Sequence, residues 1–280
     1  MTKFFLDSCD PAQTAKAIKV LGSLNGQTTN PSLLLKNPKL QGELQSGKIS
    51  QKRLLELYKE AIIDISKQIP DGSISIEVYA DHNSTVADLL FQAQYFYGWI
   101  NNAHIKFPTT AVGLEAGHQF VNSGGKVNMT LVFGQEQALA VHLATLNAKN
   151  KGDVFVSPFI GRLDDIGLNG MDLVGNILKM YKELDSKVEV LGASVRTLRH
   201  FDECLTYNCD IITAPLSTLE QYQKDKIYNL EADQTFVQSL KPINYLELDY
   251  NSDYHNIDIN HNLTDAGLIR FANDWNSVLL

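Results

Sequence analysis

One lysine interrupts the apolar stretch NAHIKFPTT at residues 102–110, and its side chain could carry covalent chemistry. The ammonium of Lys106 is costly to bury without a partner, so the lysine either reaches water or is buried for a purpose. Burial and nearby arginines would disfavour the ammonium and leave a free amine, which attacks a ketone to form a Schiff base. The iminium is an electron sink for cleaving or forming carbon–carbon bonds, and a carboxylate must then move a substrate hydroxyl proton. The chain must therefore bring acids close to Lys106.

Polar side chains recur where the short apolar runs of the chain end. Strict alternation along SISIEVY separates Glu77 from the apolar face of that run. Along KVNMTLVF the same period directs Met129 and Leu131 outward and the intervening polar residues inward. The polar residues at these ends are Asp7, Thr28, Asn30, Glu77, Lys106, Asn128, Thr130, Ser157, Ser194 and Arg196. Their convergence on one rim would form a site.

Single members of this set also have purely structural explanations. Asp7 could cap the helix that follows it, and Asn30 could be a turn residue before a proline. Lys106 could be a surface lysine whose stem packs on apolar neighbours. These explanations become improbable together, because all of them would have to hold on the same rim.

Arginines near the later runs suggest an anion site. Arg162 follows VSPFIG, and Ser194 and Arg196 share a parity at the end of KVEVLGASVR. The guanidinium fork matches phosphate oxygens, so these three residues suit a phosphate group. The alternative is that the two arginines pair on the surface with Asp164 or Glu203.

Eight strand-like runs alternate with helix-length amphipathic segments. The runs cover residues 3–7, 26–30, 73–79, 103–107, 126–133, 153–158, 187–194 and 209–214. This number of units in 280 residues predicts a single closed (β/α)8 TIM barrel, of the α/β class, rather than an open doubly wound sheet. A barrel carries its active site at the carboxyl ends of its strands, where the polar residues gather. Ser84 is expected to cap the helix over 84–100, and Gly124 and Gly125 to end the helix before them.

Two segments fall outside the regular alternation. An insertion of roughly 31–70 follows the second strand and contains a clear helix over 51–69. Residues 1–225 are expected to form the barrel, and residues 226–280 a C-terminal extension that closes with a helix over 263–275. The extension is expected either to pack on the barrel or to form a subunit contact, as in a homodimer.

Composition excludes several classes of protein. Acidic residues number 32 against 24 basic ones, so the net charge of -8 does not favour nucleic-acid binding. No apolar run is long enough to span a membrane, and the first residues do not form a signal peptide, so a cytoplasmic protein is expected. The seven histidines and three cysteines show no metal-ligand spacing. We therefore expect no metal, no other cofactor, no nucleic acid and no membrane partner.

The chain resembles the transaldolases, which are class I, Schiff-base aldolases. The matching segments are FLDS, QTTNPSLL, IEVYA, HIKFPTTAVGLEA, KVNMTLVF, VSPFIGRLDD, LGASVR and ITAPLSTL. They occur in the family's order over roughly residues 3–222, and TTNPSL and SPFIGR are the most specific of them. Phe107 departs from the branched aliphatic residue that usually follows the lysine, so substrate specificity is expected to differ there first.

The resemblance implies a (β/α)8 barrel with Lys106 as the Schiff-base lysine and Asp7 as the acid/base for the C4 hydroxyl. It implies that Glu77 and Thr130 hold the catalytic water. The implied substrate-binding residues are Asn30, Thr28, Asn128, Ser157, Phe159, Arg162, Ser194 and Arg196, of which Arg162, Ser194 and Arg196 form the phosphate site. The implied reaction moves a dihydroxyacetone unit from sedoheptulose 7-phosphate to glyceraldehyde 3-phosphate in the pentose phosphate pathway.

Two other functions remain open. The fructose-6-phosphate aldolases, a sister group that releases free dihydroxyacetone, carry Gln at the position of Glu77 and Tyr at that of Phe159, so both residues favour the transferase. Chains of that group are also compact and lack an insertion or an extension of this kind. A barrel that binds sugar phosphates without turnover is disfavoured, because Lys106, Asp7 and Glu77 are all present.

Overall fold

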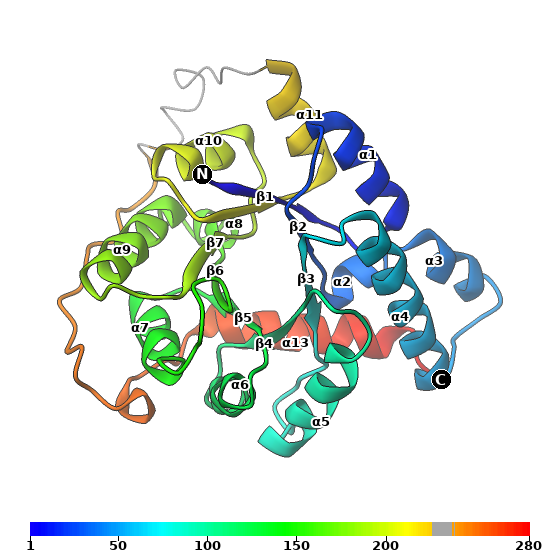
Figure 1. Ribbon diagram of the computed structural model, residues 1–280, viewed down its shortest axis with the longest axis horizontal. Coiled ribbons are helices and arrows are strands. Elements are labelled where there is room, and N and C mark those ends of the chain that lie inside the picture. The colour runs from blue at the N-terminus through cyan, green and yellow to red at the C-terminus, as the bar shows by residue number, and fades with distance from the viewer. Residues whose placement is uncertain (226–236, 238) are drawn as a thin grey trace.

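The computed structural model describes residues 1–225, 237 and 239–280. Its centre is a closed barrel of eight parallel strands in sequence order (Figure 1), which confirms the predicted TIM barrel. The strands are β1 (Lys3–Asp7), β2 (Gly26–Thr28), β3 (Ser73–Glu77), β4 (Ala103–Pro108), β5 (Val127–Val132), β6 (Val154–Pro158), β7 (Glu189–Gly192) and β8 (Ile211–Ala214).

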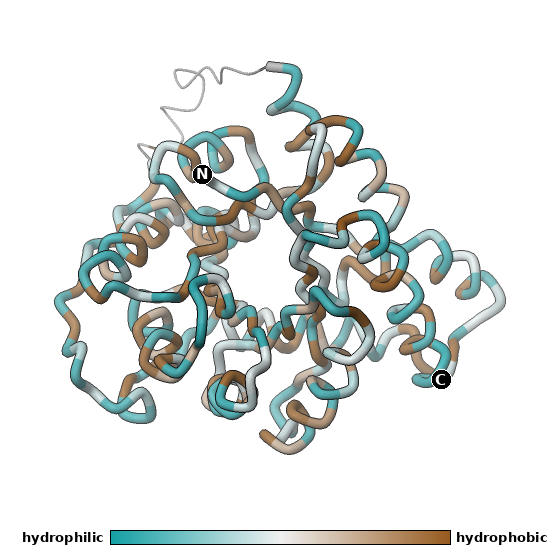
Figure 2. The backbone as a smooth tube through the Cα atoms, in the orientation of Figure 1, coloured by the Kyte–Doolittle hydropathy of each residue, from teal (hydrophilic) through white to brown (hydrophobic). Residues whose placement is uncertain are grey.

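Helices surround the barrel on the outside (Figure 1). Those on the regular βα units are α1 (Pro11–Leu21), α5 (Val86–Tyr97), α6 (Ala111–Asn122), α7 (Gln135–Ala144), α9 (Gly170–Glu183), α10 (Leu198–Thr206) and α11 (Leu216–Asp225). The others are α2 (Pro31–Leu34), α3 (Pro38–Leu44), α4 (Gln51–Gln68), α8 (Ile160–Asp164), the 3-10 helix η2 (Tyr254–Asn256) and α13 (Asn262–Ser277). Hydrophobic and hydrophilic residues alternate along the outer helices (Figure 2), as expected for helices with one face on a sheet.

Local capping explains where the helices begin. The side chain of Asp10 accepts a hydrogen bond from the amide of Ala12 at the start of α1, where Pro11 needs no hydrogen-bond partner for its nitrogen. Helix α5 begins with a capping box in which Thr85 and the N3 side chain satisfy each other's backbone amides. The prediction that Ser84 caps this helix was therefore wrong by one residue. Gly124, just beyond α6, has a φ of 91°, as the expected left-handed stop requires.

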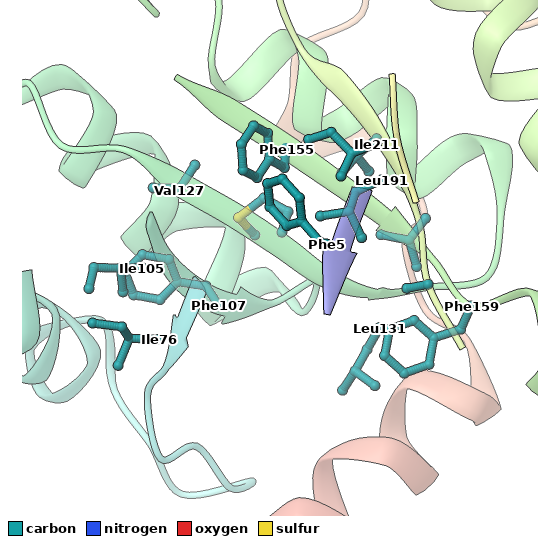
Figure 3. Packing of buried hydrophobic residues seen from close by; sticks show 14 of the residues in the cluster. Phe5, Ile76, Ile105, Phe107, Val127, Leu131, Phe155, Phe159, Leu191 and Ile211 are labelled. Carbon is teal, nitrogen blue, oxygen red and sulfur yellow. The ribbon is translucent and has the colours of Figure 1, made fainter. Parts of the chain in front are cut away.

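The inside of the barrel has an apolar floor below its polar end. The rings of Phe5 and Phe155 meet edge to face with centroids 6.0 Å apart, and Leu191 and Ile211 lie beside them (Figure 3). All four side chains are buried. Because the same strands end in polar residues, the polar side chains lie directly above this buried apolar layer.

Strand β5 departs from regular alternation near its end. Its register with β6 shifts between Met129 and Val132, and Leu131 has a φ of 61°. The prediction that Leu131 points outward with Met129 was wrong, because this bulge turns its side chain toward α13. Leu131 lies next to α13 in Figure 3, and its carbonyl accepts a hydrogen bond from Thr264 of α13 at 2.9 Å.

The C-terminal helix crosses the end of the barrel at which the strands finish. Helix α13 (red in Figure 1) contacts both β5 and the short helix α2 of the insertion. Just after the end of α13, Leu279 forms a parallel β-bridge with Ile49 of the insertion. The expected division between residues 1–225 and 226–280 stays a prediction, because residues 226–236 and 238 lie outside the described residues.

Candidate active site

Strand register brings Lys106 into a row of polar neighbours. Glu77 of β3 and Asn128 of β5 are the residues level with Lys106 on the adjacent strands, so all three project to the same side of the sheet. The Lys106 side chain is 5% exposed, and its Nζ lies 3.1 Å from Glu77 Oε2. The same Nζ donates a hydrogen bond to the Thr29 carbonyl at 3.2 Å. Lys106 is therefore a buried, ion-paired lysine and not a surface one.

Asp7 faces the inside of the barrel and leaves helix capping to Asp10. Thr28 of β2 donates a hydrogen bond to Asp7 Oδ1 at 2.7 Å, and the hydroxyl of Thr213 on β8 lies 2.6 Å from that of Thr28. Burial raises the pKa of Asp7, while Lys106 and the Thr28 hydrogen bond oppose that rise. Asp7 thus holds a proton more readily than an ordinary aspartate.

The pKa of Glu77 is also raised, at a more deeply buried position than that of Asp7. Its side chain is 4% exposed, and burial raises its pKa despite the nearby Lys106 ammonium. The negative charge of Asp7 adds to the rise. We call Lys106, Glu77 and Asp7 the lysine centre, because the ammonium and both carboxyl groups influence one another.

Further buried polar residues lie around the lysine centre. Ser157 donates to Asn128 Oδ1 at 2.6 Å, and Asn128 Nδ2 donates to Ser75 at 3.0 Å, which fixes the amide orientation. Thr130 is fully buried, and its hydroxyl has no hydrogen-bond partner within the described part of the chain. A buried hydroxyl without a partner is costly, which fits a position that serves a bound molecule.

A cavity of about 280 Å³ opens above the lysine centre. Nine of the residues predicted for the site line it: Asp7, Thr28, Asn30, Lys106, Ser157, Phe159, Arg162, Ser194 and Arg196. Glu77, Asn128 and Thr130 do not line it, although Glu77 contacts Lys106 and Asn128 contacts Ser157. Asn30 has two roles, because its side chain also caps α2 by accepting from the Leu33 amide at 2.9 Å.

The far wall of the cavity is cationic. The guanidinium of Arg162 lies over the ring of Phe159 at 5.5 Å and over that of Phe271 at 5.7 Å, in the range of cation–π contacts. Burial lowers the pKa of Arg162, and repulsion from Arg270 and Arg196 lowers it further. Among the residues that the structure describes, no carboxylate forms an ion pair with Arg162.

The surface ion pairs considered for these arginines do not form as expected. Asp164 and Glu203 pair with Arg199, a buried residue outside the cavity, rather than with Arg162 or Arg196. Arg196 instead pairs with Asp165 at 2.5 Å and keeps 44% of its side chain exposed.

The loop that carries Ser194 has a special backbone. Ser194 has a φ of 55°, and its carbonyl accepts a hydrogen bond from the Gly161 amide at 3.1 Å. A Cβ on Gly161 would stand 2.6 Å from that carbonyl and 2.8 Å from Arg196. Glycine is therefore required for the loops after β6 and β7 to approach this closely.

Comparison with known proteins shows the family of the chain. The family model described as Transaldolase/Fructose-6-phosphate aldolase matches residues 4–280. The chain belongs to this family. The match includes the C-terminal segment, which the motifs in the sequence did not cover.

Individual relatives agree with the family. Proteins named "Probable transaldolase" from Brucella ovis and Cereibacter sphaeroides are each 38% identical to this chain. The first matches over 79% of this chain and 89% of its own length, and the second over 78% and 86%. A thiamine phosphate pyrophosphorylase structure from Pyrococcus furiosus has a TM-score of 0.47 at 10% identity, over 79% of this chain and 94% of its own, which supports no inference.

Several residues of this family member's cavity were missed by the sequence patterns. They are Ser32, Lys36, Thr213, Arg270 and Phe271. Thr213 could have been found, because it is a polar residue near the end of the eighth run. Arg270 gave no signal, since nothing in the sequence places the final helix across the barrel mouth.

Phe107 lies outside the cavity, where it cannot contact a bound substrate directly. It is fully buried and lies with Ile76 and Ile105 (Figure 3), and its ring meets that of Phe120 on α6 at 6.0 Å. Because β4 alternates, Phe107 points into the helix layer while Lys106 points inward. It does not line the cavity.

Metal-binding clusters and membrane-spanning helices are both absent from the described residues. No group of three His, Cys, Asp or Glu side chains there is placed to hold a metal ion. Within the same residues, no helix is both long and apolar enough to cross a membrane.

Proposed function

We propose that the protein is a transaldolase that carries a dihydroxyacetone unit on Lys106 as a Schiff base. The unit moves from sedoheptulose 7-phosphate to glyceraldehyde 3-phosphate, giving erythrose 4-phosphate and fructose 6-phosphate. We assign the reaction to the pentose phosphate pathway in the cytoplasm. No cofactor takes part in this proposal.

The observation that carries the proposal is the lysine centre. A buried lysine with an ion-paired carboxylate 3.1 Å away and a second carboxyl group in the same cavity suits imine chemistry. The pKa of both carboxyl groups is raised by burial, so either can take up a proton near neutral pH more readily than an exposed acid.

The first half of the reaction forms the imine. The Lys106 ammonium passes a proton to Glu77, and the free amine attacks the C2 carbonyl of the ketose. Glu77 then protonates the carbinolamine hydroxyl, which leaves as water and gives the iminium. Thr130 lies on the strand beside β4, level with Pro108, and we assign to its unpartnered hydroxyl the task of holding this water.

The second half cleaves and remakes a carbon–carbon bond. Asp7 takes the proton of the C4 hydroxyl, the C3–C4 bond breaks, and its electron pair moves into the iminium to give an enamine on Lys106. The aldose phosphate leaves, the acceptor aldehyde enters, and the same steps run in reverse with Asp7 returning the proton. Asn30, Asn128 and Ser157 are assigned to the hydroxyl groups of the three-carbon unit.

The cationic wall is assigned to the substrate phosphate. Arg162, Ser194 and Arg196 come from neighbouring loops and line the same side of the cavity. A guanidinium binds phosphate oxygens through paired charge-assisted hydrogen bonds. Phe159 positions Arg162 by lying under its guanidinium. The homodimer considered from the sequence stays a prediction.

A transfer assay tests the proposal. The enzyme is given fructose 6-phosphate and erythrose 4-phosphate, and glyceraldehyde 3-phosphate and sedoheptulose 7-phosphate are measured together with free dihydroxyacetone. We expect equal amounts of the two phosphates and little free dihydroxyacetone. Faster release of dihydroxyacetone without an acceptor would instead assign the protein to the aldolase branch of the family. Binding of fructose 6-phosphate without any product would assign a non-catalytic barrel.

A further inference from the structure

Two cavity residues have no part in the reaction proposed above. Arg270 lies on α13, and Lys36 follows the short helix α2. Both side chains are exposed at the mouth of the cavity. They come from segments that lie about 230 residues apart in the chain.

Helix α13 is firmly attached at this mouth. Thr264 donates to the Leu131 carbonyl at 2.9 Å and accepts from Gln137 at the same distance. Asp274 of α13 accepts a hydrogen bond from Ser32 of α2. A Cβ on Gly267 would stand 2.5 Å from the Leu131 side chain, so the helix cannot lie closer. These contacts fix the positions from which Arg270 and Phe271 reach the cavity.

The positive charges at the mouth are only partly neutralised. Lys106 is paired with Glu77, and Arg196 with Asp165. Within the described part of the chain, the carboxylate that pairs with Arg270 is distant: the Arg270 Nε lies 3.9 Å from an Asp274 oxygen that also accepts from Ser32. In the described residues Arg162 has no carboxylate partner, and Arg270 stands near enough to repel it. Cations held together in this way cost free energy that a bound dianion would offset.

We propose that Arg270 and Lys36 form a second cationic side of the phosphate site, opposite the loops that carry Arg162 and Arg196. The substrate phosphate then lies between two loops of the barrel and a helix from the C-terminal segment. This inference rests on the proposed function and extends it to substrate selection: the added charges favour the dianionic phosphate of a sugar phosphate and disfavour sugars without one. We call these four residues the cationic rim.

Neutral variants test the second side directly. Arg270→Gln and Lys36→Gln should each raise KM for fructose 6-phosphate by about tenfold, the usual range for losing one charge-assisted hydrogen bond. Arg270→Gln should leave kcat within about twofold, whereas Lys36→Gln also removes a positive charge that lowers the pKa of Asp7. Arg270→Lys should recover most of the loss, because the charge remains. D-fructose, which lacks the phosphate, should be turned over equally by the natural protein and the Arg270 variants. Asn273→Gln, an exposed change on the same helix, and Lys19→Gln, an exposed change on α1, are matched controls.

Binding of inorganic phosphate to the whole protein separates this inference from the catalytic proposal. Calorimetric titration with inorganic phosphate should show about 30-fold or greater weakening in the Arg270→Gln/Lys36→Gln double variant, and no change in the controls. Unchanged phosphate affinity in a folded double variant would overturn the inference. If the natural protein showed no transfer activity but the double variant lost phosphate binding, the proposed function would fail and the phosphate site would stand.

Discussion

The lysine centre and the cationic rim lie at the same end of one barrel but are built in opposite ways. The lysine centre projects from strand ends, Lys106 and Glu77 in it are almost fully buried, and these two opposite charges lie in contact. The rim projects from the short helix α8, from loops and from the C-terminal helix, and much of it is exposed, with 44% of the Arg196 side chain and 63% of the Arg270 side chain accessible.

This difference separates two ways of using charge. In the lysine centre, burial changes the proton affinity of the carboxyl groups, so the low local polarity itself prepares acid–base chemistry. At the rim, several like charges act together on the phosphate of a ligand, and salt screens the more exposed of them. Changes in the lysine centre should therefore alter kcat, whereas changes at the rim should alter KM.

The largest effect is expected from Lys106. Lys106→Met should lower kcat by about 10⁴-fold or more, because the amine that carries the three-carbon unit is removed. Its removal also leaves Glu77 without a partner, which destabilises a buried carboxylate. Lys106→Arg keeps the ion pair and should be just as inactive, so a folded Lys106→Arg protein, checked by circular dichroism, controls for misfolding. Activity within tenfold of the natural protein would refute the role of the lysine.

The next largest effect is expected from Asp7. Asp7→Asn should lower kcat by about 10²- to 10⁴-fold, because the C4 hydroxyl loses its proton acceptor. KM for fructose 6-phosphate should change little, and imine formation at Lys106 should persist. Steady-state kinetics with borohydride trapping distinguish these steps. A variant that cleaves the donor at the natural rate would remove Asp7 from the mechanism.

The two rim arginines should differ from each other. Arg162→Gln should raise KM for fructose 6-phosphate by about 100-fold, since Arg162 is half-buried and clamped between aromatic rings. Arg196→Gln should raise it by about tenfold, because Asp165 already neutralises part of its charge. Kinetics at two ionic strengths would measure both effects. Equal losses in the two variants, or equal losses for D-fructose, would contradict the assigned phosphate site.

The smallest effect is on stability and tests the burial of charge. The pKa of Asp7 is raised in the folded protein. The folded state is therefore favoured while Asp7 is protonated, and the protein loses stability as the pH rises through the raised pKa. Asp7→Asn should therefore be more stable than the natural protein at neutral pH, by about 1.4 kcal/mol for each unit by which burial raises the pKa. The gain should vanish at a pH where Asp7 is protonated in both states. Thermal unfolding between about pH 3 and pH 8, a range that extends below the ordinary pKa of an aspartate, would show it, and a variant less stable at every pH would contradict it.

The lysine centre could be predicted from sequence because strand periodicity and register determine where side chains point. Glu77, Lys106 and Asn128 lie level on adjacent strands, so alternation alone places them together. The exceptions had local causes. Leu131 left the expected face through a bulge, and Phe107 lies outside the cavity because the same alternation buries its ring under α6.

The rim could be predicted only in part, because it depends on long-range packing. The SPFIGR and LGASVR motifs marked Arg162 and Arg196, and the alternative that they pair with Asp164 or Glu203 was wrong. Asp165 pairs with Arg196, and neither the motifs nor the periodicity distinguishes it from Asp164. The position of Arg270 depends on where α13 packs, and contacts such as the hydrogen bond from Thr264 to the Leu131 carbonyl determine that packing.

Trapping the imine tests the central claim most directly. The protein is incubated with fructose 6-phosphate and borohydride and then digested, and the masses of its peptides are measured by mass spectrometry. The account predicts a reduced three-carbon or ketose adduct on the peptide that contains Lys106, and none in Lys106→Arg. An adduct on a different lysine, or turnover without any adduct on Lys106, would contradict the account.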